Sequence, residues 1–519
     1  MIRIRKQATG IIAAAAMLFG MLAVSVEPPQ AQANPVTYYV STTGSDSNPG
    51  TSSSAPWKTL QYAADHAVPG STVYVLGGVY NQKLKITRSG SAAAGPITFE
   101  SSPAQAAIID GTGLSVSGSE GLVDIADASY VTLKGFEIRN YATSAKGKMP
   151  VGIFVRGTGS HIELRNNNVH HIKNTATLGS DLAGRDAHGI AVYGTKAPTA
   201  LEHIVIDGNT LSNLVLGSSE SLVVNGNVDK FEITNNLIHD NDNIGIDVIG
   251  FEGKAPDPAY DQARNGLIRG NTVYNITSNN NPSYGKSIPN DSNAAGGIYV
   301  DGGKDTVIEQ NYSYNNDIGI EIASEHKGKA TSGVMIRNNL VYGNRYTGIA
   351  MGGYDKERGS TVNCVIVNNT LYKNDTKDLG GGQLLLQYDT QNNIVKNNIM
   401  VAGSSNILIY NEYAKNSGNV VDYNLYYAPG GASNATWTWK NNEYTGFAAY
   451  KSGTGNDAHS LFADPQFVNA SANNFHLKAT SPAINAGSTE PAIIGAADID
   501  GQPRVQGSGV DIGADEATP

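Results

Sequence analysis

The 519-residue chain has little cysteine, little tryptophan and no excess of positive charge. With one Cys it cannot form an internal disulfide, so a hydrophobic core has to hold the fold, and we expect Cys364 to be part of it. The formal net charge of −10 argues against a nucleic-acid partner, which would need a basic surface. No apolar run after residue 33 is long enough to span a bilayer. A membrane anchor is therefore not expected. We also expect the protein to be a monomer.

Residues 1–33 have the layout of a secretory signal peptide. Basic residues precede the apolar run IIAAAAMLFGMLAVSV, and the small residues of AQA at 31–33 provide a cleavage site. We therefore expect the mature protein to be secreted and extracellular.

One phrase recurs eight times between residues 162 and 399, an alternating apolar run that closes on Asn and a further apolar residue. The closing asparagines are Asn167, Asn209, Asn236, Asn271, Asn311, Asn339, Asn369 and Asn398. A period of 27 to 42 residues without helical stretches is typical of a β-solenoid, in which stacked coils bury one another's apolar side chains. We expect the asparagine amides to hydrogen-bond along the stack at an inward bend.

Aromatic rings follow this phrase, three residues after the Asn. They are His170, His239, Tyr274, Tyr314, Tyr342 and Tyr372. Stacked rings stabilise a solenoid, and a row of rings can also bind the flat faces of sugars. The sequence leaves both interpretations open.

The opening YYVSTTGSDSNPGTSSSAPWKTLQ, the Asn phrase and the ending DIDGQPRVQGSGVDIGADE resemble secreted right-handed parallel β-helix carbohydrate-active proteins of the bacterial polysaccharide lyase and glycoside hydrolase type. The resemblance implies an all-β, right-handed parallel β-helix that acts on a polysaccharide. We predict an N-terminal cap and first coils at 34–130, with a short capping helix within 57–67. The coils with the groove follow at 131–410, and closing coils and a C-terminal cap at 411–519.

A second phrase, Gly-Ile-x-φ-x-Gly, maps the outward face of the coils, because alternate residues of a strand point to opposite sides. The first outward column reads Phe154, Ala191, Val223, Asp247, Tyr299, Glu321 and Ala350, and the second reads Arg156, Tyr193, Asn225, Ile249, Asp301, Ala323 and Gly352. Three acids, Asp247, Asp301 and Glu321, thus fall on adjacent coils, with Asp247 and Glu321 roughly 9–10 Å apart. Such crowding of like charges indicates a functional site, although each acid alone could be a solvated surface residue.

Insertions support a groove around these acids. Residues 173–186 and 276–294 leave the stack just before the acidic strands, and residues 251–264 leave it just after Asp247. We predict that the walls bind substrate through Tyr299, Glu252, Glu325, His326, Tyr354, Asp186, His188 and Lys286.

The acids predict hydrolysis of a glycosidic bond. Carboxyl groups ~6.5–9.5 Å apart leave room for a water molecule and lead to inversion. An acid of the first column would protonate the leaving oxygen, and Asp301 or Glu321 would activate water.

Two alternatives stay open. One is a polysaccharide lyase with Tyr299, Lys286 or His326 as base, in which the acidic trio and Glu252 would hold Ca²⁺ against the charge of a uronate. The other is a glycan-binding or adhesin solenoid without catalysis. Apart from Ca²⁺, no cofactor is expected.

Overall fold

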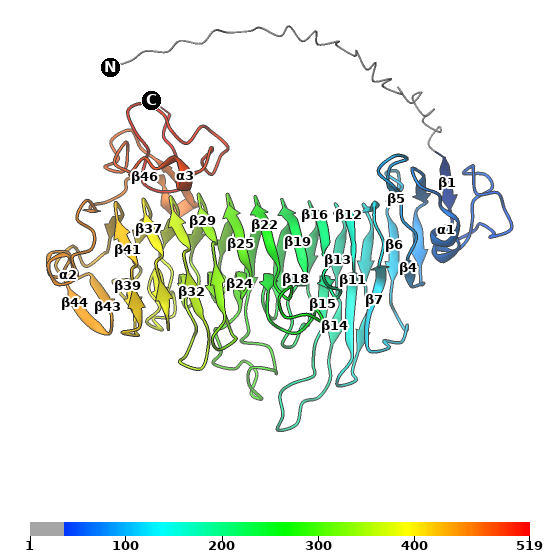
Figure 1. The fold of residues 1–519 in the computed structure, drawn as a ribbon, viewed down its shortest axis with the longest axis horizontal. Helices are drawn as coiled ribbons and strands as arrows, with labels where there is room; N and C mark the ends of the chain where they lie inside the picture. The colour runs from blue at the N-terminus through cyan, green and yellow to red at the C-terminus, as the bar shows by residue number, and fades with distance from the viewer. Residues whose placement is uncertain (1–35, 519) are drawn as a thin grey trace, which may run out of the picture. The chain divides into compact units, whose positions relative to one another are not determined.

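Residues 36–518 of the computed structural model are described, and they form a parallel β-helix of three sheets (Figure 1). The predicted signal peptide, 1–33, lies outside the described residues. A coil passes from sheet I to sheet III and then to sheet II, as β21 (Ile246–Ile249), β22 (Arg264–Arg269) and β23 (Thr272–Ile276) do before β24 (Gly296–Asp301) re-enters sheet I. No helix among the described residues is long and apolar enough to cross a membrane.

The strands of each sheet follow one another along the stack. Sheet I contains β4 (Leu84–Ile86), β7 (Ser119–Ala126), β11 (Met149–Gly157), β15 (His188–Gly194), β18 (Leu222–Gly226), β21, β24, β27 (Ile318–Ala323), β31 (Thr347–Met351), β35 (Leu384–Leu386), β39 (Ile407–Asn411), β43 (Thr436–Trp439) and β44 (Asn442–Thr445). Sheet II contains β3 (Gly78–Tyr80), β6 (Ala107–Asp110), β9 (Glu137–Arg139), β13 (Asn168–His170), β17 (Thr210–Ser212), β20 (Leu237–Asn241), β23, β26 (Tyr312–Tyr314), β30 (Leu340–Tyr342), β34 (Thr370–Tyr372), β38 (Ile399–Val401), β42 (Leu425–Tyr427) and β45 (Leu461–Phe462). Sheet III contains β1 (Thr37–Val40), β2 (Thr72–Val75), β5 (Ile97–Ser101), β8 (Val131–Lys134), β12 (Gly159–Arg165), β16 (Leu201–Asp207), β19 (Val228–Thr234), β22, β25 (Lys304–Glu309), β28 (Ala330–Ser332), β29 (Met335–Arg337), β32 (Ser360–Val362), β33 (Val365–Val367), β36 (Thr390–Gln391), β37 (Ile394–Lys396), β40 (Asn416–Ser417) and β41 (Val420–Asp422).

Short elements complete the chain. Two small sheets pair β10 (Ala142–Thr143) with β14 (Lys173–Asn174), and β46 (Phe467–Asn469) with β47 (Asn474–Leu477). The helices are α1 (Leu60–His66), α2 (Phe447–Thr454), α3 (Pro491–Ile494) and the 3₁₀ turn η1 (Ala470–Ala472).

The core is a continuous column of apolar side chains inside the coils. Ile246 and Val248 of β21 point inward and are fully buried, as are the register-matched Ile298 and Val300 of β24. Cys364 is buried in the same core, as predicted.

Helix α1 lies at the N-terminal end of the coils, within the predicted range 57–67. It begins at Leu60 because the side chain of Thr59 accepts a hydrogen bond from the amide of Tyr62 and caps the helix. Leu60, Ala63 and Ala64 face β1 and β4 and are buried there.

The recurring asparagines form a hydrogen-bonded ladder at the bend between sheets III and II. Oδ1 of Asn311 accepts from the backbone N (2.9 Å) and Nδ2 (3.0 Å) of Asn271. Its own Nδ2 donates to Oδ1 of Asn339 at 2.9 Å and to the carbonyl of Ile268 at 2.9 Å. The same contacts run from Asn167 to Asn398, and Asn424 adds one more rung. The ladder is therefore structural.

The aromatic row on sheet II is stacked. Ring centroids are 5.0 Å apart for His239 and Tyr274, 5.1 Å for Tyr274 and Tyr314, and 4.8 Å for Tyr314 and Tyr342. Further along, Phe475 packs against Tyr342 and Tyr372. That end of the row is covered by the protein itself, which favours the stabilising interpretation of the rings.

The chain after β45 lies against the outside of the coils. Phe467, Phe475 and Leu477 bury apolar residues of sheet II, while Ile493 and Ile494 of α3 pack on Val367 of sheet III. In Figure 1 this segment lies beside the upper edge of the C-terminal coils. The segment therefore packs on sheets II and III.

Candidate functional site

The strand register brings the predicted acids together on sheet I. Asp247 of β21 pairs with Tyr299 of β24, and Tyr299 pairs with Glu321 of β27. Asp301 pairs with Ala323, two residues further along the strands. These pairings agree with the outward columns expected from the Gly-Ile phrase, whereas the catalytic roles assigned to the three acids stay predictions.

A cavity of about 630 Å³ opens beside the C-terminal part of this cluster. Its lining comprises Ile244, Tyr284, Asp291, Asn293, Ala294, Tyr299, Ile318, Glu321, Glu325, Tyr346, Tyr354, Leu379 and Gln387. The insertion 276–294 provides one wall, as expected. Of the three predicted catalytic acids, Glu321 alone lines the cavity, while Asp247 and Asp301 lie next to it.

Glu321 sits at the floor of the cavity with 6% of its surface exposed. Burial, helped by the negative charge of Glu325, raises the pKa of its carboxyl to about 8. Glu321 is therefore a carboxylic acid at neutral pH and can donate a proton to a ligand.

Glu325 follows the end of β27 and is only half-buried. Burial raises the pKa of its carboxyl, while the positive charge of Arg358 lowers it. Its backbone N–H donates to Oδ1 of Asp301 at 2.7 Å, which fixes the start of the loop that carries Glu325. The two cavity glutamates thus have different surroundings.

Asp247 and Asp301 are almost fully buried. Burial raises the pKa of Asp247 strongly, and the charges of Glu220 and Asp301 add to the effect. Burial and the charge of Glu325 likewise raise the pKa of Asp301, although the hydrogen bond from the Glu325 amide opposes the shift. Oδ1 of Asp247 and the hydroxyl of Tyr299 are buried without a hydrogen-bond partner. Unpaired buried polar atoms are rare, and they indicate a place for a ligand group.

A second polar cluster lies on the N-terminal side of Asp247. Nδ1 of His188 donates to the carbonyl of Glu220 at 3.0 Å, so Nε2 accepts from the hydroxyl of Tyr193 at 2.9 Å. Burial lowers the pKa of His188 to about 4, so the ring is neutral. Nδ2 of Asn225 donates to Glu252 at 2.8 Å. The predicted binding residues His188 and Glu252 therefore lie here, outside the cavity.

The other predicted binding residues divide in the same way. Tyr299, Glu325 and Tyr354 line the cavity. Asp186 belongs to the second cluster, where the hydroxyl of Ser219 donates to it at 3.4 Å. His326 is half-buried and Lys286 is exposed, and neither lines the cavity.

Several residues of the site were not predicted. Tyr284, Tyr346 and Gln387 line the cavity, and Glu220 faces Asp247. Tyr346 stands directly before the recurring TGIAM phrase, so its position beside the first outward column could have been noticed. Glu220, in contrast, belongs to an irregular segment with no repeat to place it.

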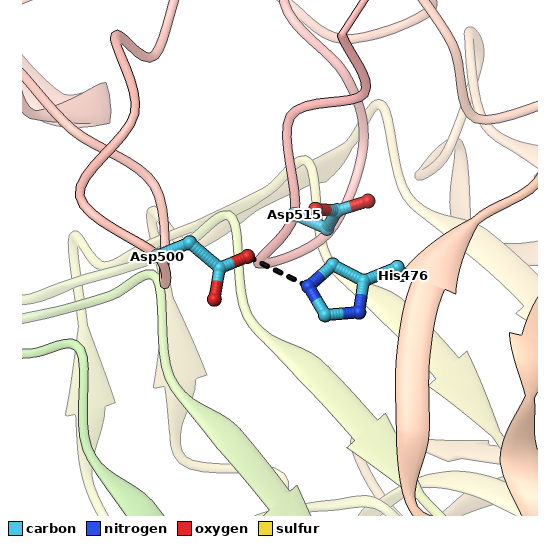
Figure 2. A group of neighbouring side chains, drawn as sticks. All are labelled: His476, Asp500 and Asp515. Atoms are coloured by element: carbon cyan, nitrogen blue, oxygen red, sulfur yellow. Dashed lines mark hydrogen bonds and ion pairs between the residues drawn. The ribbon is translucent and has the colours of Figure 1, made fainter.

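One possible metal-binding group lies elsewhere, in the C-terminal segment (Figure 2). In the described part of the chain, His476, Asp500 and Asp515 are the one group of three such residues whose ligand atoms lie within 4.8 Å of one another. Nε2 of His476 forms an ion pair with Asp500 at 2.7 Å. The carboxylate of Asp515 accepts a hydrogen bond from the backbone N–H of Leu477 at 2.8 Å. The group ties three segments together as an ion-paired cluster. The acids of sheet I do not converge to this degree, and Ca²⁺ there stays a prediction.

Comparisons with known proteins agree with the architecture. A model of the Pel9A-like right-handed β-helix region matches residues 38–193, and a model of the right-handed β-helix region matches residues 151–371. The chain is 43% identical to the protein YwoF of Bacillus subtilis over 446 residues. The aligned region covers 86% of this chain and 91% of YwoF. The pectate lyase PEL9 of Emericella nidulans is 30% identical over 169 residues, or 30% of this chain and 37% of that lyase.

A solved structure gives the same picture of the fold. XylC, determined in complex with xylose, aligns with a TM-score of 0.50 at 11% identity and covers 92% of this chain and 98% of XylC. The right-handed parallel β-helix predicted from the repeats is thus confirmed.

Proposed function

The chain belongs to the right-handed β-helix family that includes YwoF of Bacillus subtilis, and we propose that it hydrolyses glycosidic bonds in an extracellular polysaccharide. The observation that carries the proposal is the cavity on sheet I, with a protonated glutamic acid at its floor and a second glutamate at its wall. Residues 1–33 would direct the protein out of the cell.

Glu321 is the general acid of this proposal. Its pKa of about 8 keeps the proton on the carboxyl at neutral pH, and its position at the cavity floor gives a bound sugar access to it. Transfer of this proton to the glycosidic oxygen lets the leaving sugar depart as an alcohol. General acid catalysis of this kind contributes about 10²–10⁴-fold to a rate.

Glu325 activates the water. Glu325 is half-buried at the cavity wall, and the positive charge of Arg358 opposes the rise that burial causes in its pKa. Its carboxylate takes a proton from water, and the resulting hydroxide equivalent adds to the anomeric carbon from the side opposite the leaving group. Asp301 acts as a positioning residue, because it holds the Glu325 amide at 2.7 Å.

A β-elimination mechanism is the second candidate, favoured by the similarity to a pectate lyase over 169 residues. It needs a base to remove a proton beside a uronate carboxylate. Burial and the charge of Asp301 raise the pKa of Tyr299, so its phenol stays protonated and is a poor base. Lys286 and His326 lie outside the cavity lining. These positions support hydrolysis over elimination.

The test is a screen of plant, algal and bacterial polysaccharides in which reducing ends and near-ultraviolet absorbance are followed together. Hydrolysis yields reducing ends alone, whereas elimination also yields an absorbing unsaturated end. Glu321→Gln should lower kcat at least ~10²-fold. The control Glu357→Gln, at an exposed residue outside the cavity, should retain the wild-type rate. Absorbing products, or full activity of Glu321→Gln, would overturn the proposal.

The positioning role of Asp301 has its own test. Asp301→Asn keeps a side-chain oxygen that can accept the hydrogen bond from the backbone N–H of Glu325, whereas Asp301→Ala removes that oxygen. We expect Asp301→Ala to lower kcat with little change in KM, and Asp301→Asn to recover much of the loss. Equal loss in both variants would instead make the Asp301 carboxylate a direct participant.

A further inference from the structure

The lining of the cavity on sheet I contains acidic side chains and no basic ones. Its acidic lining residues are Asp291, Glu321 and Glu325, and none of its thirteen lining residues, all within the described chain, is Lys, Arg or His. Oε1 of Gln387 and Oδ1 of Asn293 are buried acceptors with no hydrogen-bond partner. These two oxygens can be satisfied by hydrogen-bond donors of a bound ligand.

The nearby cations do not reverse this character. Arg358 lies against the ring of Tyr354, with its Cζ 4.4 Å from the ring centroid, and its Nη1 donates to the Glu325 carbonyl at 3.3 Å. Lys254 lies 3.5 Å from the Glu252 carboxylate in the second polar cluster. A uronate would therefore bring its negative charge close to the acids Asp291 and Glu325, and no cation in the lining would offset the repulsion.

An ammonium group fits the same surroundings. It is a positive charge with three donors and no acceptor, so it complements the acids of the lining and the unpaired amide oxygens. Aromatic rings from three separate segments, those of Tyr284, Tyr346 and Tyr354, border the cavity as well. Such rings pack against sugar faces and attract cations through their π-electrons.

We propose that the substrate is a glycan containing amino sugars with free amino groups, such as glucosamine, and that the cavity binds one such residue. The inference rests on the proposed hydrolysis, since it names the sugar on which Glu321 acts. Gln387 and Asn293 would accept hydrogen bonds from the sugar, and Asp291 at the cavity wall would supply a negative charge for the ammonium group.

The experiment compares glucosamine oligosaccharides in β-1,4 and β-1,6 linkage with their fully N-acetylated forms and with polygalacturonate. We expect kcat/KM for the free-amine form to exceed that for the N-acetylated form by ~10–100-fold, the size of one charge-assisted hydrogen bond. Polygalacturonate should not be cleaved. Asp291→Asn should raise KM for the free-amine form several-fold, whereas Asp257→Asn, at an exposed residue outside the lining, should leave KM unchanged.

Binding is measured separately by titration calorimetry with Glu321→Gln. If the wild type cleaves neutral or uronate glycans in a Glu321-dependent way and prefers them, the amino-sugar inference falls while the proposed hydrolysis stands. If Glu321→Gln binds glucosamine oligosaccharides but the wild type cleaves none of the glycans, the ligand class stands and the proposed hydrolysis falls. If glucosamine oligosaccharides are neither bound nor cleaved, the inference is overturned.

Discussion

Replacing Glu321 with Gln should stabilise the protein while removing its activity. The carboxyl is buried, and its pKa is raised from 4.5 to about 8, so the folded state binds the proton more tightly than the unfolded chain does. The stability that comes from the protonated form is complete below the unfolded pKa of 4.5. It is lost as the pH rises from 4.5 towards about 8.

The size of the effect follows from the width of that pH window. One pKa unit corresponds to about 1.4 kcal/mol, so the wild type gives up on the order of 3 kcal/mol between pH 4.5 and pH 7. Gln resembles the protonated acid in shape and does not titrate. Glu321→Gln should thus match the wild type at pH 4.5 and exceed it at pH 7. With an unfolding entropy of about 2 cal/mol/K per residue, the gain in Tm at pH 7 is about 3 °C.

The assay is thermal unfolding of wild type and variant in matched buffers at pH 4.5 and pH 7. Glu232→Gln is the control, because Glu232 is exposed on sheet III and its replacement should shift Tm equally little at both pH values. A Glu321→Gln variant that is less stable than the wild type at pH 7, or equally shifted at both pH values, would refute the reasoning. It would mean that Glu321 is ionised and paired in the folded protein.

Three further predictions concern other parts of the molecule. Asn311→Ala should lower the free energy of unfolding by about 3 kcal/mol in urea titrations, since it leaves buried donors and acceptors of the ladder unpaired. Tyr299→Phe removes a buried hydroxyl that has no partner in the protein, so Tm should hold or rise. The same change should lower kcat/KM, because Tyr299 lines the cavity and its hydroxyl can no longer bond a ligand there. Burial lowers the pKa of His476, but Asp500 and Asp515 outweigh it and raise the pKa, so His476→Gln should destabilise at pH 6 and have little effect at pH 9.

The fold could be predicted because successive coils require the same residue types at the same positions, so the pattern recurs in the sequence. The side-chain amide of each ladder asparagine accepts hydrogen bonds from the Asn of the preceding coil and donates one to the Asn of the next coil. Asn therefore recurs at the same bend of successive coils. The alternation in each strand then fixes which residues face outward, and Asp247, Tyr299 and Glu321 are found in the expected register. Repetition and period-two alternation are properties that a single sequence displays directly.

The cavity could be predicted only in part, because its walls come from segments that do not repeat. Gln387 and Tyr284 reach the site through loop conformations that no periodic pattern specifies. The same holds for the separation of His188 and Glu252 from the cavity, which depends on how the insertions fold over the sheet. Which acids lie on one face could be read from the register, but which of them faces a ligand depends on the walls.

The proposal that Glu321 is the acid of a glycoside hydrolase is tested most directly by product analysis on glucosamine oligosaccharides and polygalacturonate with wild type and Glu321→Gln. Reducing ends and near-ultraviolet absorbance are recorded in the same reaction. We predict reducing ends without absorbance from the glucosamine oligosaccharides, formed by the wild type and lost in Glu321→Gln. Absorbing products from polygalacturonate, formed equally by both proteins, would contradict this account.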